Sequence, residues 1–422
     1  MSAFYVMSKQ KRLRHAAHAH RPNKAASGAL MEVFVERIVP GGMGLAHADG
    51  KTVFVALAAQ GDHVRVRLEK TRGNVHFASI VEVLEPSPAR VPPPCPYFGR
   101  CGGCDFQQLN YNAQLEAKVS IVQDCLRRLA RIEMPIEIAI KASPNSWRYR
   151  SRAQWQYDAR RKALGYFERG SHQVCDVVEC PVIVPALQET LTNLREAMRD
   201  NILPEHVAEF HAVAGDAAVS IVPPVNQAMI EREASRTING FQYQFDATGF
   251  FQINHELLPL LVETALGDVH GDTAVDLYCG AGLFTLPLAG RFTRVVGVEA
   301  SDTAITYARR NLKAARLTNA NVECARVGDW LKRRAADFAP IDLVLLDPPR
   351  AGVEDRDALD GILTLQSKRI AYVSCDPATL ARDLRELIGG GYTLDSVTAF
   401  DMFPQTHHVE TIAHLSLSSR AL

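Results

Sequence analysis

Apolar and polar residues alternate along the chain from about residue 30 to residue 88. Alternation with a period of two puts every second side chain on one face of a β-strand, so each run predicts a strand with one buried face. The apolar positions are Val33, Val35, Val53, Val55, Val64, Val66 and Leu68. Glycine-containing turns at 41–44, 61–62 and 72–74 separate the runs. The pattern therefore predicts a small β-barrel over residues 30–88.

The period changes after a proline-rich stretch. Prolines are concentrated between residues 86 and 96, and they predict a linker because proline continues neither a sheet nor a helix. A helix is then expected from about residue 111 to 131, where apolar residues recur every three or four positions. These residues are Leu115, Val119, Val122, Leu126 and Leu129. Short strands are expected at 153–157 and 163–166.

From about residue 245 the chain alternates apolar strands, glycine turns and helices, which predicts an α/β domain with a doubly wound parallel sheet. A chain of 422 residues is also too long for one ordinary domain. We therefore expect a basic disordered tail at 1–29, the barrel at 30–88, a central domain at 89–244 and the α/β domain at 245–422.

Net charge does not indicate a polyanionic partner, because 47 Lys and Arg balance 47 Asp and Glu. The distribution of charge does. Six basic residues and no acidic residue lie between Lys9 and Lys24, in a tail that either contacts phosphates or only solubilises the chain. Between Arg127 and Arg169, eleven basic residues face four acidic ones, with aromatic residues interleaved. Aromatic side chains beside positive charge predict a nucleic-acid surface in this second stretch.

Neither a membrane segment nor a signal peptide is expected. No apolar run approaches the roughly 20 residues that cross a bilayer. The segment from Met1 to Met7 is short and mildly apolar, and basic residues follow it without a cleavage site. The nine cysteines are an odd number, which argues against a disulfide framework. A cytoplasmic protein is therefore expected.

Three cysteines share one glycine-containing loop, at Cys95, Cys101 and Cys104. Glycine lets the backbone wrap closely around a bound group. Three local thiolates with a fourth from elsewhere suit either a zinc ion or a cubane iron–sulfur cluster. Cys180 is the expected fourth ligand because the proline after it fixes the turn, and Cys175 is the alternative. The spacing does not decide between the two metals.

A strand, a glycine turn and a helix start are predicted over residues 273–284, with Gly280 and Gly282 in the turn. Glycines there let the backbone approach a ligand at the usual crevice of such sheets. A second apolar strand ends in Glu299, whose carboxylate suits the two ribose hydroxyls of a nucleoside. These features fit NAD and a methyl donor equally well. Asp347, followed by two prolines after a third apolar strand, favours the methyl donor because a rigid loop there holds a donor beside a planar base.

Cys375 follows an apolar strand and precedes a predicted helix, and Glu410 lies thirty-five residues farther on. Helix-terminal N–H groups are expected to lower the pKa of a thiol at such a turn. A thiolate that adds to carbon 6 of a pyrimidine makes carbon 5 nucleophilic toward a methyl donor, and a general base then removes the proton from carbon 5. A lone buried cysteine is more often structural, but a place at the mouth of the donor crevice favours a catalytic role for Cys375.

Together these motifs resemble those of the bacterial 5-methyluridine RNA methyltransferases, in the branch that acts on 23S ribosomal RNA. The resemblance extends from about residue 30 to the C-terminus. It rests on the four cysteines and on the motifs Phe250–Asn254, Asp276–Gly280, Asp347–Arg350, Tyr372–Cys375 and Met402–Glu410.

The resemblance implies an RNA-binding β-barrel of the TRAM type, a small central α+β iron–sulfur domain and a Rossmann-like domain that uses S-adenosyl-L-methionine. It implies a [4Fe-4S] cluster on Cys95, Cys101, Cys104 and Cys180, and packing of helix 111–131 on the methyltransferase domain. Cys375 would be the nucleophile and Glu410 the base. The donor-binding positions would be Gln252, Tyr278, Gly280, Gly282, Leu283, Glu299, Gly328 and Asp347.

The implied substrate is a uridine of 23S ribosomal RNA that leaves its stack to reach Cys375, with Phe250 as a stacking partner. A monomer is expected. A tRNA methyltransferase is the first alternative, although that bacterial branch typically lacks the barrel and the cluster. An RNA-binding iron–sulfur protein that has lost its activity is the second.

Two residues depart from the family pattern. Asp376 stands where the family usually has asparagine, and an acid beside the thiol raises its pKa unless the carboxylate points away. Leu283 stands where relatives often carry asparagine, so one polar contact to the donor is expected to be missing.

Overall fold

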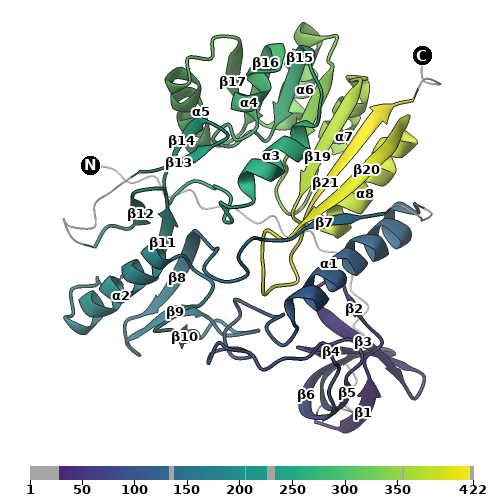
Figure 1. Cartoon of the computed structure of the whole chain (residues 1–422), viewed down its shortest axis with the longest axis vertical. Coiled ribbons are helices and arrows are strands. Elements are labelled where there is room, and N and C mark those ends of the chain that lie inside the picture. The colour runs from purple at the N-terminus through teal and green to yellow at the C-terminus, as the bar shows by residue number, and fades with distance from the viewer. Residues whose placement is uncertain (1–27, 133–136, 205, 226–232, 354–355, 419–422) are drawn as a thin grey trace, which may run out of the picture.

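The computed structural model describes residues 28–132, 137–204, 206–225, 233–353 and 356–418. The expected basic tail lies outside the described residues except for positions 28 and 29. Figure 1 shows an N-terminal barrel at one end of the molecule, a large C-terminal sheet at the other, and a smaller sheet beside them. None of the helices in the described ranges is long and apolar enough to span a membrane.

The N-terminal sheet has six strands in the order β1-β5-β6-β4-β3-β2. The strands are β1 (Leu30–Phe34), β2 (Arg37–Val39), β3 (Met43–Ala48), β4 (Lys51–Ala56), β5 (His63–Arg72) and β6 (Val75–Glu85). All seven apolar positions picked out by their alternation are buried and form most of its core. The alternating pattern therefore identified both the strands and their inner face.

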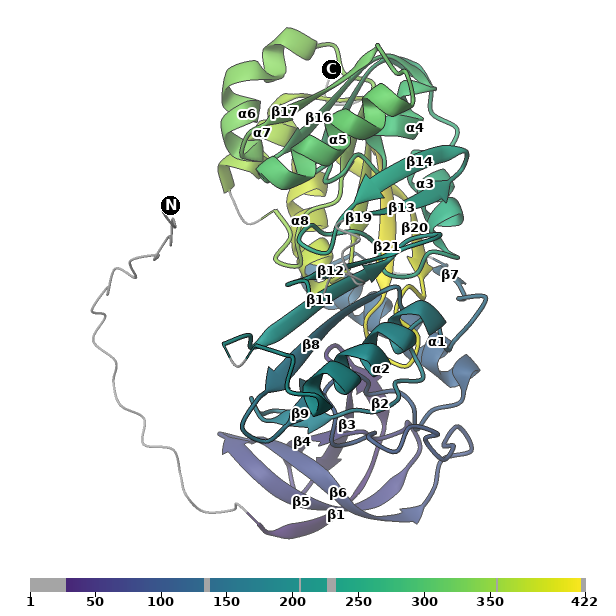
Figure 2. The same ribbon diagram turned by 90° about the vertical axis from the view of Figure 1, so that its left-hand side faces the viewer.

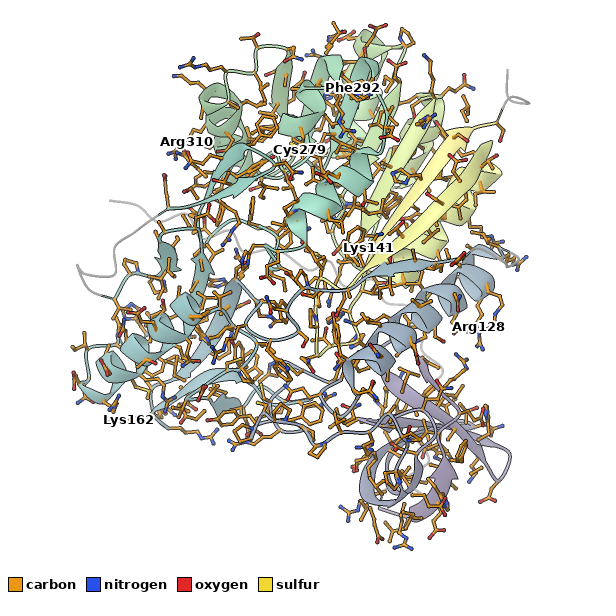
Figure 3. All side chains as sticks on the ribbon, in the orientation of Figure 1. Arg128, Lys141, Lys162, Cys279, Phe292 and Arg310 are labelled. Atoms are coloured by element: carbon orange, nitrogen blue, oxygen red, sulfur yellow. The ribbon has the colours of Figure 1, made fainter. Side chains whose placement is uncertain are left out.

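The central sheet has five strands in the order β10-β9-β8-β11-β12, and helix α2 lies across one face (Figure 2). Its elements are β8 (Arg152–Asp158), β9 (Ala163–Phe167), β10 (Val174–Asp176), α2 (Pro185–Arg199), β11 (Glu209–Ala214) and β12 (Val219–Val222). The aromatic residues Tyr149 and Trp155, expected to stack on nucleic acid, are fully buried. Alternation along β8 points Trp155 into the core under α2, and Tyr149, which precedes β8, packs with Val182 and Ile253. The basic residues Arg160 to Lys162 are exposed, and Lys162 lies at an outer corner (Figure 3).

Helix α1 (Tyr111–Cys125) continues into a π-helical turn (Leu126–Ala130) and lies between the barrel and the C-terminal domain. Ala117 and Ile121 pack against the barrel residue Ile38, whereas Val122 and Cys125 enter the C-terminal core. Of the five expected apolar positions, Val122 and Leu126 are buried. Leu129 is exposed, and Leu115 and Val119 are half-buried. Packing on two sides widens and rotates the buried face of the helix.

The C-terminal sheet has eight strands in the order β17-β16-β15-β18-β19-β21-β20-β7. The strands are β7 (Ala139–Lys141), β15 (Gly271–Leu277), β16 (Phe292–Glu299), β17 (Ala320–Cys324), β18 (Leu343–Leu346), β19 (Arg369–Ser374), β20 (Tyr392–Phe400) and β21 (Glu410–Leu417). The five strands from β17 to β19 are parallel, and β21 is antiparallel to both its neighbours. This is the predicted doubly wound α/β domain with one reversed strand near its edge.

Two hydrophobic clusters cover the two faces of this sheet. Its helices are α3 (Leu258–Leu266), α4 (Thr285–Ala289), α5 (Asp302–Ala314), α6 (Val327–Arg334), α7 (Arg356–Thr364) and α8 (Pro377–Gly389). The hairpin of β13 (Ala234–Ile238) and β14 (Phe241–Phe245) packs into the first cluster. Strand β7 pairs with β20, so a segment that precedes the central sheet in sequence completes the C-terminal one.

Candidate active site

Four residues with ionisable side chains, three carboxyl groups and one thiol, lie where the parallel strands end. Glu299 ends β16, Asp347 follows β18, and Cys375 follows β19. Strand β21 runs the other way, so its first residue, Glu410, lies at the same edge. Ser374 pairs with Thr411, which places the next residues on the two strands, Cys375 and Glu410, side by side. The sheet thus brings together a thiol and a carboxylate that are far apart in sequence.

The loop after β15 carries backbone conformations that favour glycine. Gly280 and Gly282 have φ angles of 54° and 91°, and Tyr278 also adopts a positive φ. A Cβ atom on Gly282 would lie 2.9 Å from the Leu286 side chain. Glu299 closes the loop, because its Oε2 accepts a hydrogen bond of 3.2 Å from the Gly280 N–H. These residues stand at the carboxyl ends of β15 and β16, where the sequence predicts the donor crevice.

The carboxyl groups of the crevice repel one another. Burial, aided by the charges of Asp347 and Glu299 and opposed by the hydrogen bond from Thr285, raises the pKa of Asp276 to about 8. Burial and Glu299 likewise raise the pKa of Asp347 to about 7, and burial with Asp347 holds the pKa of Glu410 well above its usual range. Oδ2 of Asp276 accepts from Thr285, but its buried Oδ1 has no hydrogen-bond partner among the described residues. The crevice therefore favours a ligand that brings positive charge and hydrogen-bond donors.

The expectation of a lowered thiol pKa at Cys375 was wrong. Burial, which is the largest cause, and the carboxylates of Glu410 and Asp347 together raise its pKa to about 12, while Arg350 opposes the shift. Removal of the thiol from water and the nearby carboxylates therefore outweigh the helix N-terminus. Without a ligand, the protein holds Cys375 as a thiol.

Arg350 is the cation that faces this group. Its guanidinium lies near the Cys375 sulfur and favours the thiolate. Arg350 Nη2 also donates a hydrogen bond of 3.0 Å to the ring of His408. Burial, followed by the charges of His407 and Arg350, lowers the pKa of His408 to about 3, so this imidazole is neutral and accepts the bond.

Asp376 points away from the thiol. Its carboxylate caps α8, and Oδ1 accepts hydrogen bonds of 2.9 Å and 3.1 Å from the N–H groups of Ala378 and Thr379. A helix N-cap prefers aspartate and asparagine about equally. The departure from the family's asparagine therefore keeps the local structure, and the carboxylate is committed to the helix.

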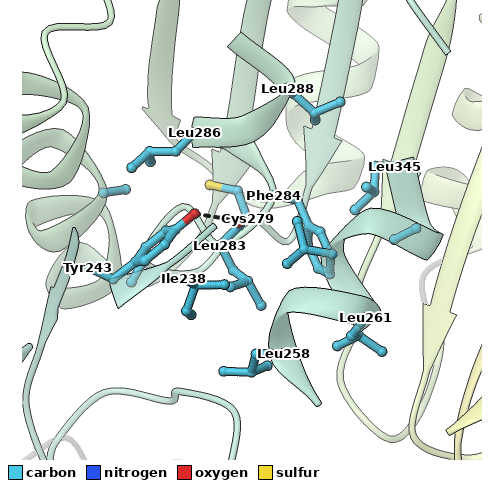
Figure 4. Packing of buried hydrophobic residues seen from close by; sticks show 14 of the residues in the cluster. Ile238, Tyr243, Leu258, Leu261, Cys279, Leu283, Phe284, Leu286, Leu288 and Leu345 are labelled. Atoms are coloured by element: carbon cyan, nitrogen blue, oxygen red, sulfur yellow. Dashed lines mark hydrogen bonds between the residues drawn. The ribbon is translucent and has the colours of Figure 1, made fainter. Parts of the chain in front are cut away.

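The remaining expected donor residues lie around the crevice. Gly328 is buried on the first turn of α6, which follows β17 at the same edge. Gln252 is buried, and its neighbour Phe251 packs in the same cluster as Leu283. Figure 4 shows Leu283 among apolar side chains, with its carbonyl oxygen accepting from the Tyr243 hydroxyl at 3.0 Å. The Leu283 side chain therefore belongs to the core.

A second cluster of predicted residues lines a cavity in the central domain. All four expected metal ligands, Cys95, Cys101, Cys104 and Cys180, line it, whereas Cys175 does not. Burial, the largest cause, raises the pKa of Cys101 to about 11 and of Cys104 to about 12. No three His, Cys, Asp or Glu side chains in the described part of the chain stand close enough together to hold a metal ion directly.

Arg150 also lines this cavity, and its Nε is buried with no hydrogen-bond partner among the described residues. Arg150 lies near Cys104 and Cys180, since both interact with its charge. A buried cation beside four cysteines suits a site in which the cysteines are thiolates, because it offsets their negative charge.

Sequence reasoning missed part of this arrangement. Asp276 was named only as part of the motif Asp276–Gly280, although an acidic residue within an apolar strand indicates a buried side chain. The role of Arg350 was missed as well, and its signal was the basic residue after the two prolines. The contacts of the segment before Glu410 had no signal in the local sequence, because their partners are about 300 positions away.

Comparisons with known proteins agree with this geometry. The family model for tRNA (Uracil-5-)-methyltransferase matches residues 224–417, and the TRAM domain model matches residues 24–81. The chain is 33% identical to the Uncharacterized RNA methyltransferase tlr0942 of Thermosynechococcus vestitus, over 93% of this chain and 99% of the relative. It is 32% identical to the 23S rRNA (uracil(1939)-C(5))-methyltransferase RlmD of Pectobacterium atrosepticum, over 92% of this chain and 94% of the relative.

A solved structure has the same fold. The crystal structure of Pyrococcus abyssi tRNA (uracil-54, C5)-methyltransferase in complex with S-adenosyl-L-homocysteine superposes with a TM-score of 0.73 at 24% identity. The alignment covers 91% of this chain and 100% of that chain.

Proposed function

Because the chain belongs to the (uracil-5-)-methyltransferase family of RNA-modifying enzymes, we propose that it methylates carbon 5 of a uridine in 23S ribosomal RNA, with S-adenosyl-L-methionine as the methyl donor. The observation that carries this proposal is the juxtaposition of Cys375 and Glu410 at the end of the β19–β21 ladder, beside the Gly280–Glu299 crevice. A nucleophile, a base and a glycine loop closed by a carboxylate at one sheet edge are what this chemistry requires.

In the proposed mechanism the Cys375 thiolate adds to carbon 6 of the uracil, and the electron pair moves to carbon 5. Carbon 5 then bonds to the methyl group of the sulfonium donor, while the methyl–sulfur bond breaks and its electron pair stays on the donor sulfur, which leaves as the neutral thioether S-adenosyl-L-homocysteine. Glu410 then removes the proton from carbon 5, the carbon 5–carbon 6 double bond re-forms, and the carbon 6–sulfur bond breaks to return the thiolate. Every bond that Cys375 makes is broken again, so the residue is a nucleophilic catalyst.

The shifted pKa values support these roles. A desolvated base, with its pKa held well above its usual range by burial, suits proton removal from carbon. Arg350 lies near the thiol and stabilises it as the thiolate when substrate displaces water. Glu299 would accept the ribose hydroxyls of the donor, and Asp347 would hold the donor beside the base.

The target uridine would leave its stack to reach Cys375. Phe250 is 67% exposed in the segment before α3, where an aromatic ring is available to stack on a base. Arg160, Arg161 and Lys162 on the outer corner of the central sheet, together with the TRAM barrel, would contact phosphates.

The cavity of the central domain fits a [4Fe-4S] cluster held by Cys95, Cys101, Cys104 and Cys180. Four thiols surround a space, rather than touching one another, and Arg150 offsets the negative charge that four thiolates bring. A cluster there would supply thiolate–iron bonds that tie the Cys95–Cys104 loop to the turn at Cys180. Cys175 is not proposed as a ligand, because it lies in strand β10 outside the cavity lining.

A tRNA substrate is the second candidate, because the similar solved structure is that of a tRNA (uracil-54, C5)-methyltransferase. Relatives named for 23S ribosomal RNA that align over nearly the whole chain favour the ribosomal substrate. Loss of activity is disfavoured, since Asp376 caps α8 and leaves the thiol accessible to Arg350.

The substrate is tested by comparing 5-methyluridine in ribosomal RNA and in tRNA from cells with and without the protein. We expect one ribosomal 5-methyluridine to disappear and tRNA to be unchanged. The mechanism is tested with RNA containing 5-fluorouridine, which has no proton to lose from carbon 5. A covalent protein–RNA adduct should form with the wild type and be absent with Cys375→Ala. Unchanged 5-methyluridine in both RNAs would refute the proposal.

A further inference from the structure

The segment that carries Glu410 is held by parts of the chain outside the methyltransferase domain. This segment, Asp401–Val409, connects β20 to β21 and is here named the base loop. In Figure 1 it descends from the sheet into the space between α1 and the central domain. We propose that the TRAM barrel and α1 fix the position of the catalytic base through this loop, with Gly42 of the barrel as a positioning residue. The inference rests on the proposed function.

Helix α1 holds the start and the middle of the base loop. Lys118 is fully buried and forms an ion pair with Asp401, and its Nζ donates 3.0 Å to the carbonyl oxygen of Phe403. Gln114 and Gln405 exchange two hydrogen bonds, of 3.0 Å between the side chains and 2.9 Å from the Gln405 backbone N–H. A buried lysine is expensive unless paired, so this arrangement fixes the loop to one position on the helix.

The loop that follows the cysteines holds the middle of the base loop from another side. The backbone N–H groups of Asp105 and Phe106 both donate to the carbonyl oxygen of Gln405, at 3.1 Å and 3.0 Å. The Asp105 carboxylate accepts from the His407 backbone N–H at 2.8 Å and contacts the His407 ring at 2.5 Å. Tyr149 donates 2.8 Å to the Pro404 carbonyl. Side chains and backbone of the base loop are thus committed to outside partners.

The TRAM barrel packs against the base loop at His407. Gly42, in the turn between β2 and β3, is buried with φ of 75°, and a Cβ atom there would lie 2.7 Å from Cβ and 2.9 Å from Cγ of His407. These atoms are at the root of the side chain, so a methyl group at residue 42 would displace the His407 backbone. Gly41 is its matched neighbour, with φ of 91° and nothing within 4 Å of an added Cβ atom.

Displacement of His407 reaches Glu410 directly. Only His408 and Val409 separate them, Val409 is fully buried, and Glu410 is the first residue of β21. Cys375 directly follows β19 and is anchored by the sheet, so the base loop reaches it only through the hydrogen bond between His408 and Arg350. The barrel contact therefore acts first on the base, which lies three residues after His407.

The two halves of the reaction separate these effects. Thiolate addition and methyl transfer need Cys375 and the donor, and they leave a methylated adduct in which carbon 6 is bonded to sulfur. Release needs Glu410, which takes the carbon 5 proton while the carbon–sulfur bond breaks. A displaced base should therefore slow release and accumulate the methylated adduct.

The test uses full-length Gly42→Ala, with Gly41→Ala as control for strain in the same turn. Single turnovers are run on ribosomal RNA carrying tritium at carbon 5 of uridine, with a methyl-labelled donor. We expect Gly42→Ala to transfer methyl at the control rate, to release tritium roughly ten- to a hundred-fold more slowly, and to accumulate a methyl-labelled adduct on denaturing gels. RNA affinity and thermal midpoint are measured for both variants.

A second variant keeps the inference testable if Gly42→Ala folds poorly. Gln114→Met removes both bonds to Gln405 from α1 without touching the barrel, and it should give the same slow release and the same adduct. Equal tritium release by Gly42→Ala and Gly41→Ala, together with wild-type release by Gln114→Met, would overturn the positioning role. If instead the wild type released no tritium and Glu410→Gln formed no adduct, the proposed function itself would fail.

Discussion

The active-site crevice and the cysteine cavity each contain four ionisable side chains, but the two sets are assembled differently. The crevice residues, Glu299, Asp347, Cys375 and Glu410, stand at the ends of strands in one continuous sheet. The cysteines lie in irregular segments outside the strands of the sheet. An isolated antiparallel β-bridge joins Cys101 to Glu168. A hydrogen-bonded sheet positions the crevice without its ligand, whereas the cavity depends on whatever its thiols bind.

Their electrostatics differ too. The crevice keeps carboxyl groups of raised pKa around one exposed cation, Arg350, so it attracts a positively charged donor. The cavity encloses thiols of raised pKa beside the buried Nε of Arg150, so its residues suit an occupant that binds thiolates. The first site is prepared for a ligand that comes and goes, and the second for one that stays.

The sharpest separation of the two sites is expected in turnover. Cys375→Ala should lower methyl transfer by at least about a thousandfold, because no other group in the crevice replaces the nucleophile. Cys180→Ser should lower it far less in protein that remains folded, since the cavity lies outside the reaction. Labelled-methyl incorporation into RNA by each variant measures the difference, with the wild type as reference. Equal losses in both would remove the distinction.

The cavity should lose its occupant with one ligand and keep it with a nearby cysteine that does not line it. Protein purified without air is expected to carry about four irons. Cys180→Ser should lose most of that iron, and Cys175→Ser should keep it. Iron per chain, with the visible absorption of the protein, gives the answer. Zinc in place of iron, or loss of iron in Cys175→Ser alone, contradicts the assignment.

The free energy of unfolding of the ligand-free protein should fall as pH rises, because Asp347 loses its proton. The pKa of Asp347 in the folded protein is about 7, above its unfolded value, because of burial and Glu299. The folded state therefore binds an extra proton, and this stabilisation is complete below pH 4 and lost as pH rises to about 7. Asp347→Asn should gain roughly 2–4 kcal/mol of unfolding free energy relative to wild type between pH 4 and pH 8. Urea unfolding at both pH values measures the gain, and a pH-independent difference would contradict it.

The smallest effect is expected at Asp376, beside the nucleophile. Asp376→Asn should change the rate less than about twofold, because either residue caps α8. Asp376→Ala removes the cap and should lower stability by about 1 kcal/mol. Steady-state rates and thermal unfolding of both variants make the comparison. A large rate increase in Asp376→Asn would show that the carboxylate does act on the thiol.

The spacing of apolar residues in helix α1 predicted the helix but not the whole of its buried face. Its existence and length followed from the spacing of apolar residues, but its buried face includes Gln114, Lys118 and Asp124. A polar residue on a buried face is explained only by its partner, and Lys118 pairs with Asp401 from a segment 283 positions away. The burial of Trp155 in the basic stretch likewise depends on a distant segment, because it is decided by which face of β8 meets α2.

The sequence by itself determined the barrel strands, the doubly wound domain and the residue types of both sites, because alternation, glycine turns and strand-end acids are local properties. It also named Cys375 and Glu410 as a pair. The tertiary structure alone decided that the thiol has a raised pKa, that Asp376 turns to its helix, and that Gly42 touches the loop of the base. Burial, charge and contact at these positions come from segments distant in sequence, and only folding brings them together.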